Sequence, residues 1–190
     1  MLTLAIIIIT TIFFKGRRSV APKQAQIDAA WQYVRCRGMN EEICVLVDYS
    51  LPSGCNRLWV WDFVGRRVLL ECPVAHGRGR GVPPPGSRRD TARFSNEEDS
   101  WLSSLGGCRI AERYVGRFGV SYRLDGLDDT NSNVRRRNIV LHGQAGVPPV
   151  SVFPLRSRRS KGCFAVAKKN MELLDGLLRS RSDVLLLCCR

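Results

Sequence analysis

Hydrophobic residues recur along this chain with two different periods. A first helix is predicted between residues 21 and 42, where apolar side chains recur at helical spacing at Ile27, Ala30, Trp31 and Val34 and the pattern ends on Gly38. A second helix is predicted in "KKNMELLDGLLRS", which aligns Met171, Leu174 and Leu178 on one face. The rest of the apolar residues fall into shorter runs.

These shorter runs are typical of strands. "ICVLVDY", "RLWVWDF", "RRVLLEC", "RNIVLHG" and "DVLLLCC" are rich in β-branched, aromatic and leucine residues and are separated by turn-forming segments. Short strands with one or two peripheral helices predict a mainly β fold, a sandwich or barrel. The loops between the strands are then expected to carry the function.

The first twenty residues form a separate predicted segment. An uncharged apolar run from Leu2 to Phe14 is followed by Lys15, Arg17 and Arg18. The run has the length of a signal-peptide core and is shorter than the ~20 residues of a membrane span. We therefore divide the chain into an apolar signal or membrane-anchor segment (1–20), a linker with a short amphipathic helix (21–42) and a main domain (43–190). A buried first strand is the alternative for the apolar run.

The charge narrows the choice of partners. The chain is 44% hydrophobic and 25% charged, which is typical of a globular protein, and its formal net charge is +13. Such a charge favours acidic partners: nucleic acid, an anionic membrane surface or an acidic wall polymer. The arginines lie scattered in loops without a nucleic-acid-binding motif, so no nucleic acid partner is expected.

Three other kinds of site are not supported by the motifs. None of the eight cysteines falls in a C-x-x-C pair and the chain has two histidines, so no metal site is predicted. The glycines of "HGRGRG" do not make the dinucleotide-binding pattern. "LDGLDDTNSN" has acidic and amide residues at calcium-loop spacing, but Val134 and Val140 occupy positions that need Gly and Glu, so we interpret it as a polar turn.

Cys163 and His142 are the candidate catalytic pair. Each lies where an apolar run meets a glycine: His142 precedes Gly143, and Cys163 follows Gly162 in "RSKGCFAV". A cysteine nucleophile needs a base to form the thiolate and backbone N–H groups to hold an oxyanion. On these residues alone, a buried thiol and a hydrogen-bonded histidine are the simpler interpretation.

The wider pattern resembles the murein L,D-transpeptidase catalytic domain of the YkuD type. That family has a histidine, a spacer, then Ser or Thr, one residue, Gly and Cys. Here seventeen residues (143–159) separate His142 from Ser160, and Lys161, Gly162 and Cys163 follow. "VLVDYSLPSGCNRLWVWDF", "VAHGRGRG", "ARFSNEEDSWLSSLGG" and "YVGRFGVSYRLDGLDDTNSNVRRRNIVLHG" occur in the order seen in that family, over about residues 45–166.

The resemblance implies roles for these residues. Cys163 is the expected nucleophile and His142 the general base, oriented by the carbonyl of Gly143. The backbone N–H groups of Lys161, Gly162 and Cys163 are the expected oxyanion donors, and no metal or organic cofactor is needed.

Lys161 and Phe164 depart from the family pattern, since Trp or His commonly precedes the motif glycine and a proline often follows the cysteine. Lys161 is expected either to lower the pKa of Cys163, to face acidic groups of the substrate, or to lie exposed in a loop. Four further residues are candidates for substrate binding: Ser160, Arg137, His76 and Asn96. The alternatives are a solvated surface position for Arg137 and a loop histidine bonded to backbone for His76. Of these, Arg137 suits a carboxylate, and Asn96 suits loop fixation by local hydrogen bonds.

The expected function is therefore that of an exported cell-envelope enzyme. Its partners would be peptidoglycan stem peptides, with membrane anchoring through the N-terminal segment, and no oligomeric state is predicted. Cys163 would release D-alanine from a tetrapeptide stem, and an amine or water would resolve the thioester. A non-catalytic wall-binding protein with the same fold is the alternative.

Overall fold

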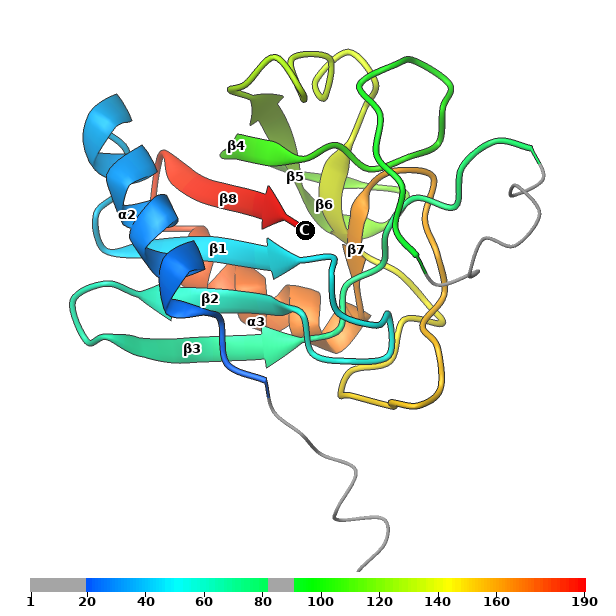
Figure 1. Ribbon diagram of the computed structural model, residues 1–190, viewed down its shortest axis with the longest axis horizontal. Coiled ribbons are helices and arrows are strands. Elements are labelled where there is room, and N and C mark those ends of the chain that lie inside the picture. The colour runs from blue at the N-terminus through cyan, green and yellow to red at the C-terminus, as the bar shows by residue number, and fades with distance from the viewer. Residues whose placement is uncertain (1–19, 82–90) are drawn as a thin grey trace, which may run out of the picture.

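Eight strands and two helices make up the regular structure of residues 20–81 and 91–190, which are the residues that the computed structural model describes (Figure 1). In chain order the elements are α2 (Gln24–Arg37), β1 (Ile43–Asp48), β2 (Leu58–Asp62), β3 (Arg67–Cys72), β4 (Gly106–Gly116), β5 (Gly119–Gly126), β6 (Val140–Gly143), β7 (Phe164–Val166), α3 (Lys168–Leu178) and β8 (Val184–Cys189). The expected signal or anchor segment lies almost wholly outside the described residues. The mainly β fold and both helices are confirmed.

The strands form one sheet in the order β3-β2-β1-β8-β4-β5-β6-β7. Neighbours are antiparallel except β1 with β8 and β6 with β7, which are parallel. Beyond β3 the chain reaches the opposite end of this order, where Ala75 bridges Ala165 of β7 and its N–H donates to the Ala165 carbonyl at 2.8 Å. This bridge nearly closes the sheet and brings the segment after β3 next to the strand that follows Cys163.

β8 and, apart from Asp48, β1 consist of apolar residues because both faces of each strand are covered. Val45 and Val47 of β1 face the main core, which also contains residues of α3, whereas Cys44 and Leu46 face α2. β8 alternates in the same way. Burial on two faces explains why these runs show no polar alternation in the sequence.

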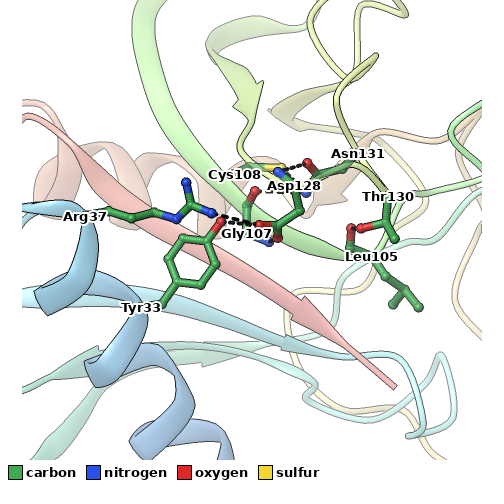
Figure 2. Close-up of polar contacts among 8 residues, drawn as sticks. All are labelled: Tyr33, Arg37, Leu105, Gly107, Cys108, Asp128, Thr130 and Asn131. Atoms are coloured by element: carbon green, nitrogen blue, oxygen red, sulfur yellow. Dashed lines mark hydrogen bonds and ion pairs between the residues drawn. The ribbon is translucent and has the colours of Figure 1, made fainter.

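Helix α2 packs against the sheet with Ile27, Ala30 and Val34 buried. A polar contact at its carboxyl end reinforces this packing (Figure 2). The Asp128 carboxylate accepts hydrogen bonds from the Tyr33 hydroxyl at 2.7 Å, the Arg37 guanidinium at 3.3 Å and the Gly107 N–H at 2.7 Å. The segment interpreted from the sequence as a linker with a helix is thus attached to the body of the protein.

The segment between β5 and β6 forms turns, as its polar sequence predicts. The Asn131 amide donates to the Gly107 carbonyl at 2.8 Å and its side-chain oxygen accepts from the N–H of Asp128 at 2.9 Å. Among the described residues no group of three or more His, Cys, Asp or Glu side chains is arranged to hold a metal ion. In that same part of the chain, no helix combines the length and the apolar character that a membrane span requires.

Candidate active site

Two neighbouring parallel strands bring His142 and Cys163 to the same cleft. His142 lies on β6, and Cys163 immediately precedes β7, whose first residue Phe164 pairs with Leu141. Two residues far apart in sequence therefore lie at one sheet edge. Both line a cleft of about 910 Å³.

The imidazole of His142 is held in its neutral form. The side chain is buried, and Nδ1 lies 2.9 Å from the carbonyl oxygen of Gly143. Because a carbonyl only accepts hydrogen bonds, Nδ1 carries the proton and Nε2 is left as the basic nitrogen. Phe118 stacks on the imidazole at a centroid distance of 4.0 Å and fixes the plane of the ring. Burial lowers the pKa of His142, and the nearby Arg117 cation adds to this effect against the Gly143 hydrogen bond.

The thiol of Cys163 is partly exposed and is protonated at neutral pH. Burial raises its pKa, and this effect exceeds the opposite ones of the Val140 N–H, Arg117 and Arg137. Sγ lies 3.7 Å from the carbonyl oxygen of Asn138. Cys163 therefore needs a base to become a nucleophile.

The other seven cysteines differ from Cys163 in their surroundings. All eight are free thiols, so no disulfide forms among them. Cys44, Cys72, Cys108 and Cys188 are buried in the hydrophobic cores, and burial raises the pKa of Cys72 and Cys108 to about 12. Within the part of the chain that the structure describes, Cys163 is the one cysteine that lines the cleft with a histidine.

The turn before Cys163 is fixed by two serine hydroxyls. Ser160 Oγ donates to the Cys163 carbonyl at 2.7 Å and accepts from the Gly162 N–H at 3.1 Å. Ser103, which is fully buried, donates from Oγ to the Gly162 carbonyl at 3.0 Å and accepts from the Gly77 N–H at 3.0 Å. The two hydroxyls thus hold both sides of the turn.

Gly162 is required at the centre of this turn. Its φ is +112°, a value that side-chain-bearing residues rarely adopt. A Cβ at this position would lie 2.6 Å from Ile139 Cδ1 and 2.8 Å from the Leu102 carbonyl oxygen. The glycine of "SKGC" therefore serves the geometry of the chain rather than its chemistry.

Arg137 and Asn96 hold the loops near the cleft. The Arg137 guanidinium donates to the carbonyls of Ser95 and Leu102 and to the hydroxyls of Ser100 and Ser104, at 2.6 to 3.0 Å. Asn96 donates to the Asp129 carbonyl and the Ser132 hydroxyl and accepts from the Asn133 N–H. The structure places both side chains among loop contacts, and neither lines the cleft.

His76 lies beneath the site and is not among the residues that line the cleft. Its Nδ1 is 2.8 Å from the Arg57 guanidinium, and its ring packs edge-on against Tyr49. The backbone carbonyl of His76 accepts from the Ser160 N–H at 2.9 Å, so the residue contacts the catalytic turn through its main chain. Residues 75–78 pair with residues 160–165 in a strand-like manner, and the His76 ring is buried on the side of Tyr49 and Arg57.

Ser103, Trp101, Arg117 and Phe118 were not singled out in the sequence, although they contact the site. Trp101 and Ser103 occur in "SWLSSLGG" and Arg117 and Phe118 in "VGRFGV", two segments noted only as part of the family resemblance. Nothing in the local pattern distinguishes the Ser103 hydroxyl from its neighbours. Its role depends on pairing between residues 77–80 and 100–103, which periodicity does not reveal.

The lining of the cleft carries more cationic than anionic side chains. The basic residues include Arg158, Arg159 and Lys161 on one chain segment, and the two acidic ones, Glu172 and Asp175, lie on α3. The complete lining consists of Arg78, Arg117, Phe118, Gly119, Val120, His142, Gly143, Gln144, Ala145, Arg158, Arg159, Ser160, Lys161, Cys163, Lys168, Met171, Glu172 and Asp175. Six of these side chains are cationic and two are anionic.

Residues 19–186 match the family described as "L,D-transpeptidase catalytic domain". A mutant of the helical cell shape determining protein Pgp2 from Campylobacter jejuni is similar in structure, with a TM-score of 0.50 and 11% identity over 88% of this chain and 56% of that chain. A mutant L,D-transpeptidase from Enterococcus faecium has a TM-score of 0.49 and 12% identity over 78% of this chain and 50% of that one. The chain thus spans about half the length of these solved structures, and at such identities the likeness concerns the fold. No curated protein matches the sequence.

Proposed function

Because the chain belongs to the family of L,D-transpeptidase catalytic domains, we propose that it is a cysteine acyltransferase acting on the stem peptides of peptidoglycan. The observation that carries the proposal is the pair formed by Cys163 and a neutral His142 at the edge of one cleft. A protonated thiol beside a neutral imidazole is the resting state from which a thiolate is produced on demand.

The first half-reaction forms a thioester. His142 Nε2 removes the Sγ proton, and the thiolate attacks the carbonyl carbon that joins the L-centre of a diamino acid to a terminal D-alanine. A carbon–sulfur bond forms and the carbonyl becomes an oxyanion. When the oxyanion collapses, the carbon–nitrogen bond breaks and D-alanine leaves with the proton from His142.

The second half-reaction releases the acyl group. An amine of a neighbouring stem gives up a proton to His142 and attacks the thioester, so an amide bond forms and the carbon–sulfur bond breaks. The thiolate of Cys163 then recovers a proton from His142. Water in place of the amine would give a carboxypeptidase with the same residues.

Two backbone N–H groups are the proposed oxyanion donors, those of Lys161 and Cys163. In a trans peptide unit the C=O and N–H point in opposite directions. The Arg78 N–H donates to the Ser160 carbonyl at 2.9 Å, and the Ser103 hydroxyl donates to the Gly162 carbonyl. The N–H groups of the same two peptide units, those of Lys161 and Cys163, therefore point away from these donors. The Gly162 N–H, expected from the sequence to join them, is engaged with Ser160 Oγ.

We assign positioning roles to the remaining candidates. Ser160 shapes the turn, Gly143 orients His142, and Arg137 holds the Ser95–Ser104 loop while its positive charge favours the thiolate of Cys163. Asn96 and His76 support the surrounding loops. A stem-peptide carboxylate for Arg137 is not favoured, since its guanidinium already has four acceptors.

The proposed location is the bacterial cell envelope. The substrate is a wall component, and the net charge of +13 suits an environment rich in carboxylates and phosphates. The apolar run of residues 2–14 would serve as the export signal or membrane anchor.

The test is mass spectrometry of the protein incubated with a disaccharide-tetrapeptide under reducing conditions. We expect release of D-alanine and an acyl adduct that maps to the peptide containing Cys163. Cys163→Ala should form no adduct. Cys36→Ala, which removes an exposed thiol outside the cleft, should react like the wild type.

A folded wild-type protein that releases no D-alanine and forms no adduct would contradict the enzymatic proposal. Retention of the same protein on purified sacculi would then support the non-catalytic wall-binding alternative. An adduct on another cysteine would contradict the assignment of the nucleophile.

A further inference from the structure

The six cations that line the cleft lack acidic partners. Within residues 20–81 and 91–190, none of Arg78, Arg117, Arg158, Arg159, Lys161 and Lys168 forms an ion pair. Arginines elsewhere are commonly paired, as Arg113 is with Asp175 and Arg135 with both Asp125 and Glu112. Like charges gathered in one cleft repel one another, so this cleft is electrostatically complementary to an anion.

Two of these cations are held against a single aromatic ring. Lys161 Nζ lies 4.5 Å and Arg78 Cζ 4.6 Å from the centroid of the Trp101 ring. Cation–π contacts of this kind fix the position of a cation without neutralising its charge. Lys161 and Arg78 are therefore ordered, charged and directed to the cleft.

The backbone at Trp101 is unusual for such a bulky residue. Its φ is +55°, in the left-handed region. The loop is kept in this conformation by the Gly79 N–H, which donates to the Trp101 carbonyl at 3.0 Å, and by the Arg80 N–H, which donates to the Ser100 carbonyl at 2.9 Å. A Cβ at Gly77 would lie 2.4 Å from the Trp101 carbonyl oxygen, so glycine permits the close approach of these two segments. Strain retained in a loop beside a reactive residue is typical of a functional position.

From these contacts we infer that Lys161 and Arg78, held on Trp101, form an anion subsite that binds a free carboxylate of the acyl-donor peptide. The inference rests on the proposed function, and it identifies a free carboxylate as the group of the acyl donor that Lys161 and Arg78 recognise. Lys161 lies two residues before the nucleophile, and the backbone of Arg78 binds Ser160, so a carboxylate held here lies on the same side of Cys163 as the Ser160–Gly162 turn. Glu172 and Asp175 on α3 are the carboxylates of the cleft lining, and they would repel the same group.

The subsite explains the position of Lys161 in the motif. The residue is exposed, and the cations that favour the thiolate of Cys163 are Arg117 and Arg137. Of the expectations raised by the sequence, contact with acidic groups of the substrate is the one that the neighbourhood of Lys161 supports.

The experiment compares matched donors. One tetrapeptide donor has all of its carboxylates free, a second has its non-terminal carboxylates converted to carboxamides, and a third has only the terminal carboxylate converted. For the wild type we expect kcat/KM of D-alanine or D-alaninamide release to fall roughly 10- to 100-fold for the donor that lacks the recognised carboxylate, as for a lost charge-assisted hydrogen bond. The donor whose kcat/KM falls shows whether the subsite binds the terminal carboxylate or a non-terminal one.

Variants connect this preference to the subsite. Lys161→Met and Arg78→Met should each reduce the preference, and the double variant should bring it within about threefold of unity. Arg80→Met is the matched control, because Arg80 lies 5.6 Å from the same ring but does not line the cleft and pairs with Asp99. It should keep the wild-type preference.

A binding measurement separates this inference from the proposed function. Calorimetric titration of Cys163→Ala with the free and amidated donors reports recognition without turnover, and it should show the same preference. Equal binding of the donors, or a preference that persists in the double variant, overturns the subsite. A preference in binding by a protein that forms no acyl adduct supports the subsite and contradicts the proposed chemistry.

Discussion

Two polar regions of this molecule hold their charges in opposite ways. Around Asp128 the carboxylate accepts from a tyrosine, an arginine and a backbone N–H, and these contacts attach α2 to the sheet (Figure 2). In the cleft beside Cys163, six cations have no described acidic partner. The Asp128 region is complete without a ligand, whereas the cleft is complementary to one.

The contrast separates residues that stabilise the fold from residues that act on a substrate. A satisfied network contributes to stability and changes little when a substrate binds, because its hydrogen bonds are already made. An uncompensated set of charges costs stability and gains its partners only on binding. Substitutions in the first region should therefore affect unfolding, and substitutions in the second should affect turnover.

The largest effect is expected for His142→Gln. This substitution keeps the side chain polar but removes the base, so thioester formation at neutral pH should slow by about 10³-fold or more. The measurement is single-turnover acylation followed by mass spectrometry. A variant that acylates within tenfold of the wild type would show that another group takes the proton of Cys163.

A smaller effect is expected for Ser103→Ala. Loss of the hydroxyl frees the Gly162 carbonyl, and the Cys163 N–H is no longer aimed at the oxyanion. We expect kcat to fall roughly 10- to 100-fold with little change in KM, less than the loss of a direct oxyanion donor. A rise in KM with unchanged kcat would assign Ser103 to substrate binding instead.

Tyr33→Phe is the corresponding substitution in the Asp128 region. It removes one hydrogen bond to a carboxylate, which should lower the free energy of unfolding by about 1–2 kcal/mol while kcat stays at the wild-type value. Urea denaturation with parallel kinetics measures both. If Tyr33→Phe lowers kcat and leaves the free energy of unfolding unchanged, the division between the two regions is wrong.

The sequence predicted the elements whose pattern is set by local burial. β1 and β8 were recognisable because both faces are buried, which leaves continuous apolar runs. The β4–β5 hairpin was not assigned, because residues such as Arg109, Glu112 and Arg113 interrupt its apolar pattern. Its side chains on one face meet solvent and ion-pair partners rather than a second layer.

The candidate pair in the cleft was predictable for a different reason. A single connection joins the neighbouring parallel strands β6 and β7, and its length sets the number of residues between His142 and Cys163. The pair can therefore be recognised from its spacing in the sequence. Ser103 and Trp101 reach the same site through pairing of residues 77–80 with 100–103, and Arg137 is directed away from the cleft by four loop acceptors. Such contacts depend on tertiary packing, which residue spacing does not encode.

The smallest expected effect concerns pH and the imidazole of His142. Burial lowers the pKa of His142 below the ordinary value of 6.5, so the folded protein binds this proton less readily than the unfolded chain. Between these two pKa values the unfolded state carries more protons, and the free energy of unfolding should fall as the pH decreases through 6.5, by at most about 1.4 kcal/mol per pH unit. The difference between the wild type and His142→Gln isolates this contribution, because the glutamine does not titrate.

The acid limb of the acylation rate should have its midpoint below 6.5 for the same reason, since Nε2 must be unprotonated to accept the thiol proton. A midpoint above that value would mean that an anion near the imidazole outweighs its burial, and the cationic surroundings of His142 would then have to be reassigned.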